Sequence, residues 1–204
     1  MKKIARWVIA LCFLGLPLAS YALDGIELLT GYFGVAQKDL EETHSTYEGV
    51  PLFVSLDFDM KPLLENIGIK TKGRIDFALE PFANTILKPN DNIEAGSNFL
   101  LKYVFPLTEK FQPYLKGGEG ISYMSQHTRE QSTQYNFLSQ AAAGFHYFFK
   151  DDLAVTVEYR YRHLSNASIS HPNNGINTDF ILGGITYYFN DTRESTSASQ
   201  SEEY

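Results

Sequence analysis

A histidine and a serine separated by one residue, His163 and Ser165, are the pair in this sequence best suited to chemistry. They continue an alternating run, residues 155–161, in which every second side chain is valine or tyrosine. Successive side chains of a strand point to opposite faces, so the pair shares the face of that run and lies roughly 6.6 Å apart. An imidazole at that distance can swing onto the hydroxyl and take its proton, as in serine hydrolases.

The polar pair has two explanations if this face of the strand contacts lipid. An unpartnered polar group in hydrocarbon costs roughly 2 to 7 kcal/mol, so either the strand has already left the membrane at His163 or the pair is catalytic. Asn177 begins the next expected strand and shares its parity with Ile181 and Ile185. A histidine, a serine and an amide would then converge on one wall.

The elements that must position these side chains are strands. Alternating polarity and turn residues predict eight of them, and a helical period is visible only near residues 61–68. An even number of strands is typical of bacterial single-chain membrane barrels. The expected fold is therefore all-β, an eight-stranded antiparallel transmembrane β-barrel. The predicted strands are residues 26–37, 47–60, 73–87, 94–106, 111–125, 134–149, 153–166 and 177–189.

The orientation of the strand faces distinguishes a membrane barrel from a soluble lipocalin-like barrel. In residues 73–80, Ile, Phe and Leu occupy one face while Asp, Ala and Glu occupy the other. Glu158, Arg160 and Arg162 lie opposite the apolar face of the seventh strand, and a small closed barrel can hold such charges inside. The connections 107–112 and 149–152 are short and those at 126–134 and 166–175 are longer, which favours a membrane barrel with a periplasmic amino terminus.

The first 22 residues have the form of a secretory signal peptide. A basic start precedes a mostly apolar run over residues 7–18, and Ser20-Tyr21-Ala22 is a small-x-small cleavage site. We expect cleavage after Ala22, a barrel over residues 23–189 and a polar, disordered periplasmic tail over residues 190–204. The only cysteine, Cys12, lies in the segment that is removed, so the mature chain forms no disulfide.

The composition excludes some partners. Removing residues 1–22 takes away three positive charges, so the formal charge of −7 becomes about −10, which disfavours nucleic acid. The 15 Phe and 13 Tyr suit a membrane barrel better than a soluble core. Both a monomer and a homodimer are compatible with these patterns.

The stretch "HLSNASISHPNNGIN", residues 163–177, resembles the signature of the outer-membrane lipid A 3-O-deacylases, the PagL family of acyloxyacyl hydrolase-like enzymes. That signature reads His-x-Ser-Asn-Ala, a short loop, then Pro-Asn-x-Gly-Ile-Glu. The resemblance implies a serine esterase in the outer membrane of a Gram-negative bacterium that removes an ester-linked hydroxy-acyl chain from lipid A of lipopolysaccharide. The polar pair would then face outer-membrane lipids because its substrate is a lipid.

The resemblance also assigns residue roles. Ser165 would attack the ester with His163 as its base. Asn177 stands where the family signature has the acid of the triad, so either Asn177 orients the imidazole or Asp179, two residues on, supplies the charge. The candidates for stabilising the oxyanion are Asn166, Asn173 and the backbone N–H of Ser168.

The mechanism implied by the resemblance needs neither a metal nor a cofactor, and the spacing of His171 from His163 does not suit zinc. The alternative function is a non-catalytic eight-stranded outer-membrane barrel with a binding or structural role.

Overall fold

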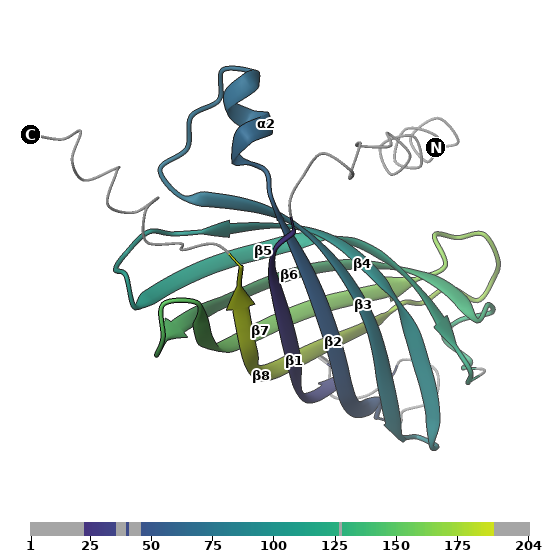
Figure 1. Cartoon of the computed structure of the whole chain (residues 1–204). Coiled ribbons are helices and arrows are strands. Elements are labelled where there is room, and N and C mark those ends of the chain that lie inside the picture. The colour runs from purple at the N-terminus through teal and green to yellow at the C-terminus, as the bar shows by residue number, and fades with distance from the viewer. Residues whose placement is uncertain (1–22, 36–39, 41–45, 127, 190–204) are drawn as a thin grey trace, which may run out of the picture.

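A computed structural model describes residues 23–35, 40, 46–126 and 128–189. Within these residues, eight strands pair in sequence order and β8 pairs back with β1, which closes an antiparallel barrel (Figure 1). The prediction of an eight-stranded barrel is confirmed. The predicted signal peptide and polar tail lie outside the described residues.

The strand bounds agree closely with those expected from the alternation. The strands are β1 (Leu23–Val35), β2 (Glu48–Asp59), β3 (Arg74–Lys88), β4 (Asn92–Val104), β5 (Phe111–Met124), β6 (Tyr135–Phe148), β7 (Leu153–Ser165) and β8 (Ile176–Tyr188). A short helix, α2 (Lys61–Asn66), forms where the helical period was visible, with a proline in its first turn. In the described part of the chain, no helix is both long and apolar enough to cross a bilayer.

The two ends of the barrel differ. β1 begins and β8 finishes at the end that also carries α2, which we call the base, and the opposite end is the rim (Figure 1). The connection from β2 to β3 runs through α2 and is longer than the other base connections, while the β3–β4 connection at the rim is short. Short base turns and longer rim loops therefore hold for the connections named from the sequence but not for all of them.

The outward faces of the strands are apolar. Burial alternates along every strand, and in β3 Asp76 and Glu80 are buried while Ile75 and Leu79 face outward, as the alternation predicted. Large side chains such as Leu101 and Ile181 are 58% and 63% exposed. An apolar outer wall of this kind suits contact with lipid.

The lumen is packed with paired charges. The ammonium of Lys116 lies 2.8 Å from Glu158 and 3.0 Å from Glu27, and Arg160 lies 2.6 Å from both Glu80 and Glu158. Arg162 bonds Glu94 at 2.5 Å. Buried charges are retained only when they are paired and hydrogen-bonded in this way. The inward face of β7 is therefore held by ion pairs directly behind the outward face that carries His163 and Ser165.

The register makes the rows of paired residues climb around the barrel. A row that begins at Gly25 in β1 passes from strand to strand through Gln140 and Arg162 and returns to β1 at Val35, ten residues nearer the rim. This stagger requires tilted strands. Each step from one strand to the next toward β8 thus rises by about 3 Å along the barrel axis.

Candidate active site

His163 and Ser165 occupy the rim end of β7 and face outward, half-buried. His163 is paired across strands with Asn177 of β8, and its Nδ1 lies 2.6 Å from the Oδ1 of that asparagine. The structure thus brings the histidine and the amide together on the outer wall, as their parity predicted. Ser165 follows two residues nearer the rim on the same face.

The hydrogen bond to Asn177 determines which nitrogen of the imidazole carries the proton. Because a carbonyl oxygen can only accept, the proton lies on Nδ1 and is donated to Oδ1. In the neutral form of the ring, Nε2 then carries no proton and can accept one from a hydroxyl. This is the tautomer that a serine nucleophile requires.

Gly175 lies against the ring of His163. Its φ of +78° belongs to the left-handed region, and a Cβ added there would come within 2.7 Å of the Cε1 of His163. Glycine is therefore required at this position for two reasons, the backbone conformation and the contact with the ring.

The loop from β7 to β8 is tied to the neighbouring rim loop by Asn166. This side chain is 1% exposed, and its Nδ2 donates to the hydroxyl of Ser132 and the carbonyl oxygen of Ser170, each at 3.1 Å. The backbone N–H of Ser132 also donates to the carbonyl of Pro172 at 3.0 Å. The amide of Asn166 is thus engaged in holding the loop.

The other two residues expected near an oxyanion lie in the same loop. Asn173 accepts the backbone N–H of Asn166 at 2.8 Å, and its Nδ2 lies 3.4 Å from the hydroxyl of Ser168. Ala167 and Ser168 have left-handed backbones, with φ of +52° and +60°. Backbone N–H groups in turns of this kind can line a concave site for negative charge.

Asp179 has a different partner from His163. The hydroxyl of Tyr159 donates to its Oδ1 at 2.6 Å, whereas the imidazole bonds Asn177. In the cross-strand register Asp179 opposes Tyr161, one outward position nearer the base than the His163–Asn177 pair.

Two further polar side chains extend the row of His163 across the wall, and the sequence motif did not indicate them. Ser139 of β6 is directly opposite His163, and Glu119 of β5 is directly opposite Ser139. Both are exposed, and the hydroxyl of Ser139 donates to the Oε2 of Glu119 at 2.7 Å. The only signal that could have found them is the strand register, because they are far from the motif in sequence.

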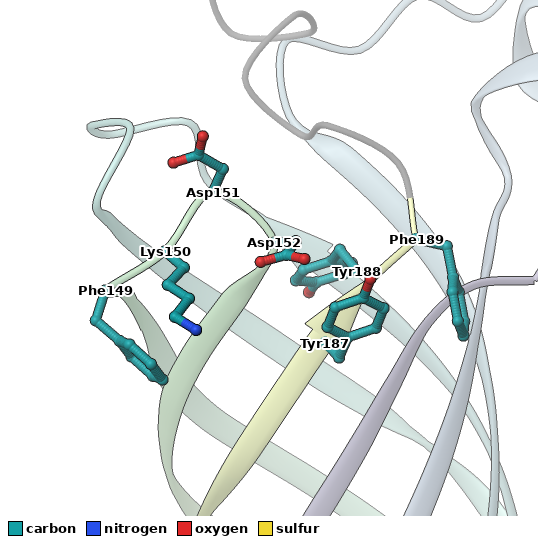
Figure 2. A pocket seen from close by; sticks show the side chains of 7 residues that line it. All are labelled: Phe149, Lys150, Asp151, Asp152, Tyr187, Tyr188 and Phe189. Carbon is teal, nitrogen blue, oxygen red and sulfur yellow. The ribbon is translucent and has the colours of Figure 1, made fainter.

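A hollow of about 580 Å³ lies at the base, far from this row. It is formed by Phe149–Asp152 of the turn after β6 together with Tyr187–Phe189 (Figure 2). Among the residues that the structure describes, no cluster of His, Cys, Asp and Glu could hold a metal ion.

These features define a class of protein, an eight-stranded membrane barrel that carries a bonded His163–Asn177 pair and, on the same face of β7, Ser165 on its outer wall. The family model for lipid A 3-O-deacylase (PagL) matches residues 48–186, and the chain belongs to this family. It is therefore a lipid A deacylase of the outer membrane of a Gram-negative bacterium.

Comparison with solved structures supports the fold. The crystal structure of the outer membrane enzyme PagL has a TM-score of 0.55 and 16% identity, covering 78% of this chain and 97% of that one. Neisserial surface protein A has a TM-score of 0.60 and 11% identity, covering 83% and 99%. No curated protein matches this chain.

Proposed function

We propose that the chain hydrolyses an ester of lipid A by serine catalysis, with Ser165 as nucleophile and His163 as general base. The observation that carries the proposal is the 2.6 Å contact between the Nδ1 of His163 and the Oδ1 of Asn177, which leaves Nε2 free to accept a proton. Ser165 is the hydroxyl next along the strand on the same face.

The reaction proceeds in two halves. The hydroxyl oxygen of Ser165 adds to the ester carbonyl as its proton passes to Nε2 of His163. Collapse of the tetrahedral intermediate breaks the bond to the sugar oxygen, which takes the proton back from His163, and leaves an acyl group on Ser165. Water, activated by His163, then attacks the acyl group and releases the fatty acid.

The negative oxygen of the tetrahedral intermediate needs donors that are already in place. The backbone N–H of Ser168 and the amide of Asn173 are the groups we assign to this role. Both belong to the β7–β8 loop, which is held by hydrogen bonds within itself and to the neighbouring rim loop. They therefore need not reorganise during the reaction. Asn166 acts by holding that loop, because its Nδ2, the group that could donate to an oxyanion, already donates to Ser132 and Ser170.

Asn177 takes the place of the triad acid by orienting His163. Its carbonyl oxygen fixes the tautomer without adding charge, as the asparagine of a Cys-His-Asn site does. The contact of Asp179 with Tyr159 supports Asn177 over Asp179 for this role.

The site faces the outer leaflet when the rim is at the cell surface and the base is in the periplasm. Lipopolysaccharide would then approach sideways within the membrane, with its sugars toward the rim and its acyl chains toward the base. The apolar outer wall provides the contact with outer-membrane lipids.

Labelling with a long-chain alkyl fluorophosphonate tests serine catalysis. We expect the phosphonate mass on the peptide that contains Ser165 in the folded protein, and a large loss of labelling in His163→Ala, because the base activates the nucleophile. A label found on another residue, or equal labelling of the two proteins, would exclude the proposed pair.

A further inference from the structure

We propose that Ser139 and Glu119 form a subsite that recognises a hydroxyl group on the acyl chain close to the scissile ester. This inference rests on the proposed function of His163 and Ser165, because it places the two residues relative to the ester that those residues would attack.

The first argument is the position of the pair. Ser139 faces His163 across the β6–β7 ladder, and side chains directly opposite each other have Cβ atoms about 4.5–5.5 Å apart. Glu119 is one strand further away in the same row. Because rows descend toward the base from β8 to β5, Ser139 lies about 3 Å and Glu119 about 6 Å nearer the base than His163.

This position is where the first carbons of the acyl chain must pass. Ser165 is nearer the rim than His163, so a chain that leaves an ester at Ser165 and runs toward the membrane interior descends past His163 to the level of the pair. The sugar lies on the opposite side of the ester. The groups within reach of Ser139 and Glu119 therefore belong to the chain and not to the headgroup.

The second argument is chemical. A carboxylate accepts hydrogen bonds and cannot donate them, while a serine hydroxyl that already donates to the carboxylate keeps lone pairs with which to accept. The pair therefore recognises a hydrogen-bond donor. An ester carbonyl and a methylene chain have none, so a hydroxyl is the group on such a chain that fits.

The third argument is the mostly apolar wall below the pair. The next outward row toward the base contains Gly117, Ala141 and Tyr161, and its only carboxylate, Asp179 on β8, bonds Tyr159 on the far side of β7 from the pair. Gly117 also borders an apolar hollow of about 420 Å³ with Leu101 and Leu115, which offers room for the rest of the chain. Ionisable side chains on a lipid-facing wall are costly, so one that persists there indicates a function.

The test uses three synthetic glucosamine 3-O-acyl esters of equal chain length and the full chain in detergent micelles. One ester carries a hydroxyl on the third acyl carbon, one carries it near the chain end and one has none. We expect the first to be cleaved with a kcat/KM about tenfold to a hundredfold above the other two.

The variants separate recognition from catalysis. Glu119→Leu and Ser139→Ala should each reduce that preference severalfold or more, because kcat/KM falls further for the ester with the hydroxyl on the third acyl carbon than for the ester without a hydroxyl. Ser97→Ala, which removes an outward serine of β4, should keep the full preference. Unchanged preference in both Glu119→Leu and Ser139→Ala, or equal losses on all three esters, would overturn the subsite.

Binding of the corresponding non-hydrolysable ethers provides a readout that needs no catalysis. Tighter binding of the ether with the hydroxyl on the third acyl carbon, lost in Glu119→Leu, supports the subsite even if no ester is cleaved. Equal affinity for all three ethers overturns it even if the serine mechanism holds. Heat-modifiable migration on a gel checks that each variant is folded.

Discussion

Replacement of Gly175 by alanine should disable the site without unfolding the barrel. The added Cβ would lie 2.7 Å from the Cε1 of His163, whereas ordinary contacts begin at 3.4 Å, so the ring must retreat by about 0.7 Å. That movement is transmitted to the 2.6 Å bond with Asn177 and to the approach to Ser165. Misplacement of a catalytic group by 1 Å can reduce rates about 10²-fold, so we expect kcat to fall by about tenfold to a hundredfold.

The matched control for Gly175→Ala is Gly68→Ala. Gly68 has a φ of +82°, and an added Cβ would have no neighbour within 4 Å, so this variant carries the backbone strain of about 1 to 2 kcal/mol without the steric contact. Release of fatty acid from lipopolysaccharide should be normal in Gly68→Ala and reduced in Gly175→Ala. Heat-modifiable migration on a gel should show that both proteins are folded. Full activity in Gly175→Ala would refute the account of how the ring is held.

Further predictions concern the catalytic pair, the acid position, the lumen and the membrane. Ser165→Ala and His163→Ala should each abolish deacylation in folded protein, and the double variant should be no worse than either, measured as kcat on lipid A. Asn177→Glu should keep or raise the rate, since a carboxylate stabilises the imidazolium, while Asp179→Asn should have little effect; a loss of up to about 10⁴-fold in Asp179→Asn would instead make Asp179 the acid. Arg160→Met should lower the free energy of unfolding by about 3–5 kcal/mol, measured by urea titration in micelles, because two buried carboxylates lose one cation and are left to share Lys116 with Glu27. The folded protein should need detergent or lipid to stay in solution, and a monodisperse detergent-free protein would contradict the outward apolar wall.

The barrel was predictable because strand alternation is a local property. Each apolar face repeats every second residue, so the sequence alone indicated that Asp76 and Glu80 share the face opposite Ile75 and Leu79. The convergence of His163 and Asn177 was predictable for the same reason, since they lie at the ends of two consecutive strands whose parity is known. The choice between a membrane barrel and a lipocalin-like barrel was less direct, because alternation does not state which face is inside.

The rest of the site depends on features that a local pattern does not contain. The opposition of Ser139 to His163 follows from the register of β6 against β7, which is set by loop lengths and packing around the whole barrel. The contact of Gly175 with the imidazole depends on the path of a loop, and the engagement of Asn166 depends on a partner in another rim loop.

The central claim is that Ser165 and His163 remove an acyl chain from lipid A on the outer wall of the barrel. The most direct measurement is the mass of lipid A after incubation of lipopolysaccharide with the purified, folded protein and, in parallel, with folded Ser165→Ala. The account predicts the loss of one ester-linked hydroxy-acyl chain with the unaltered protein and no change with the variant. An unchanged mass with the unaltered protein, alongside an active deacylase as control, or an equal loss with Ser165→Ala, would contradict it.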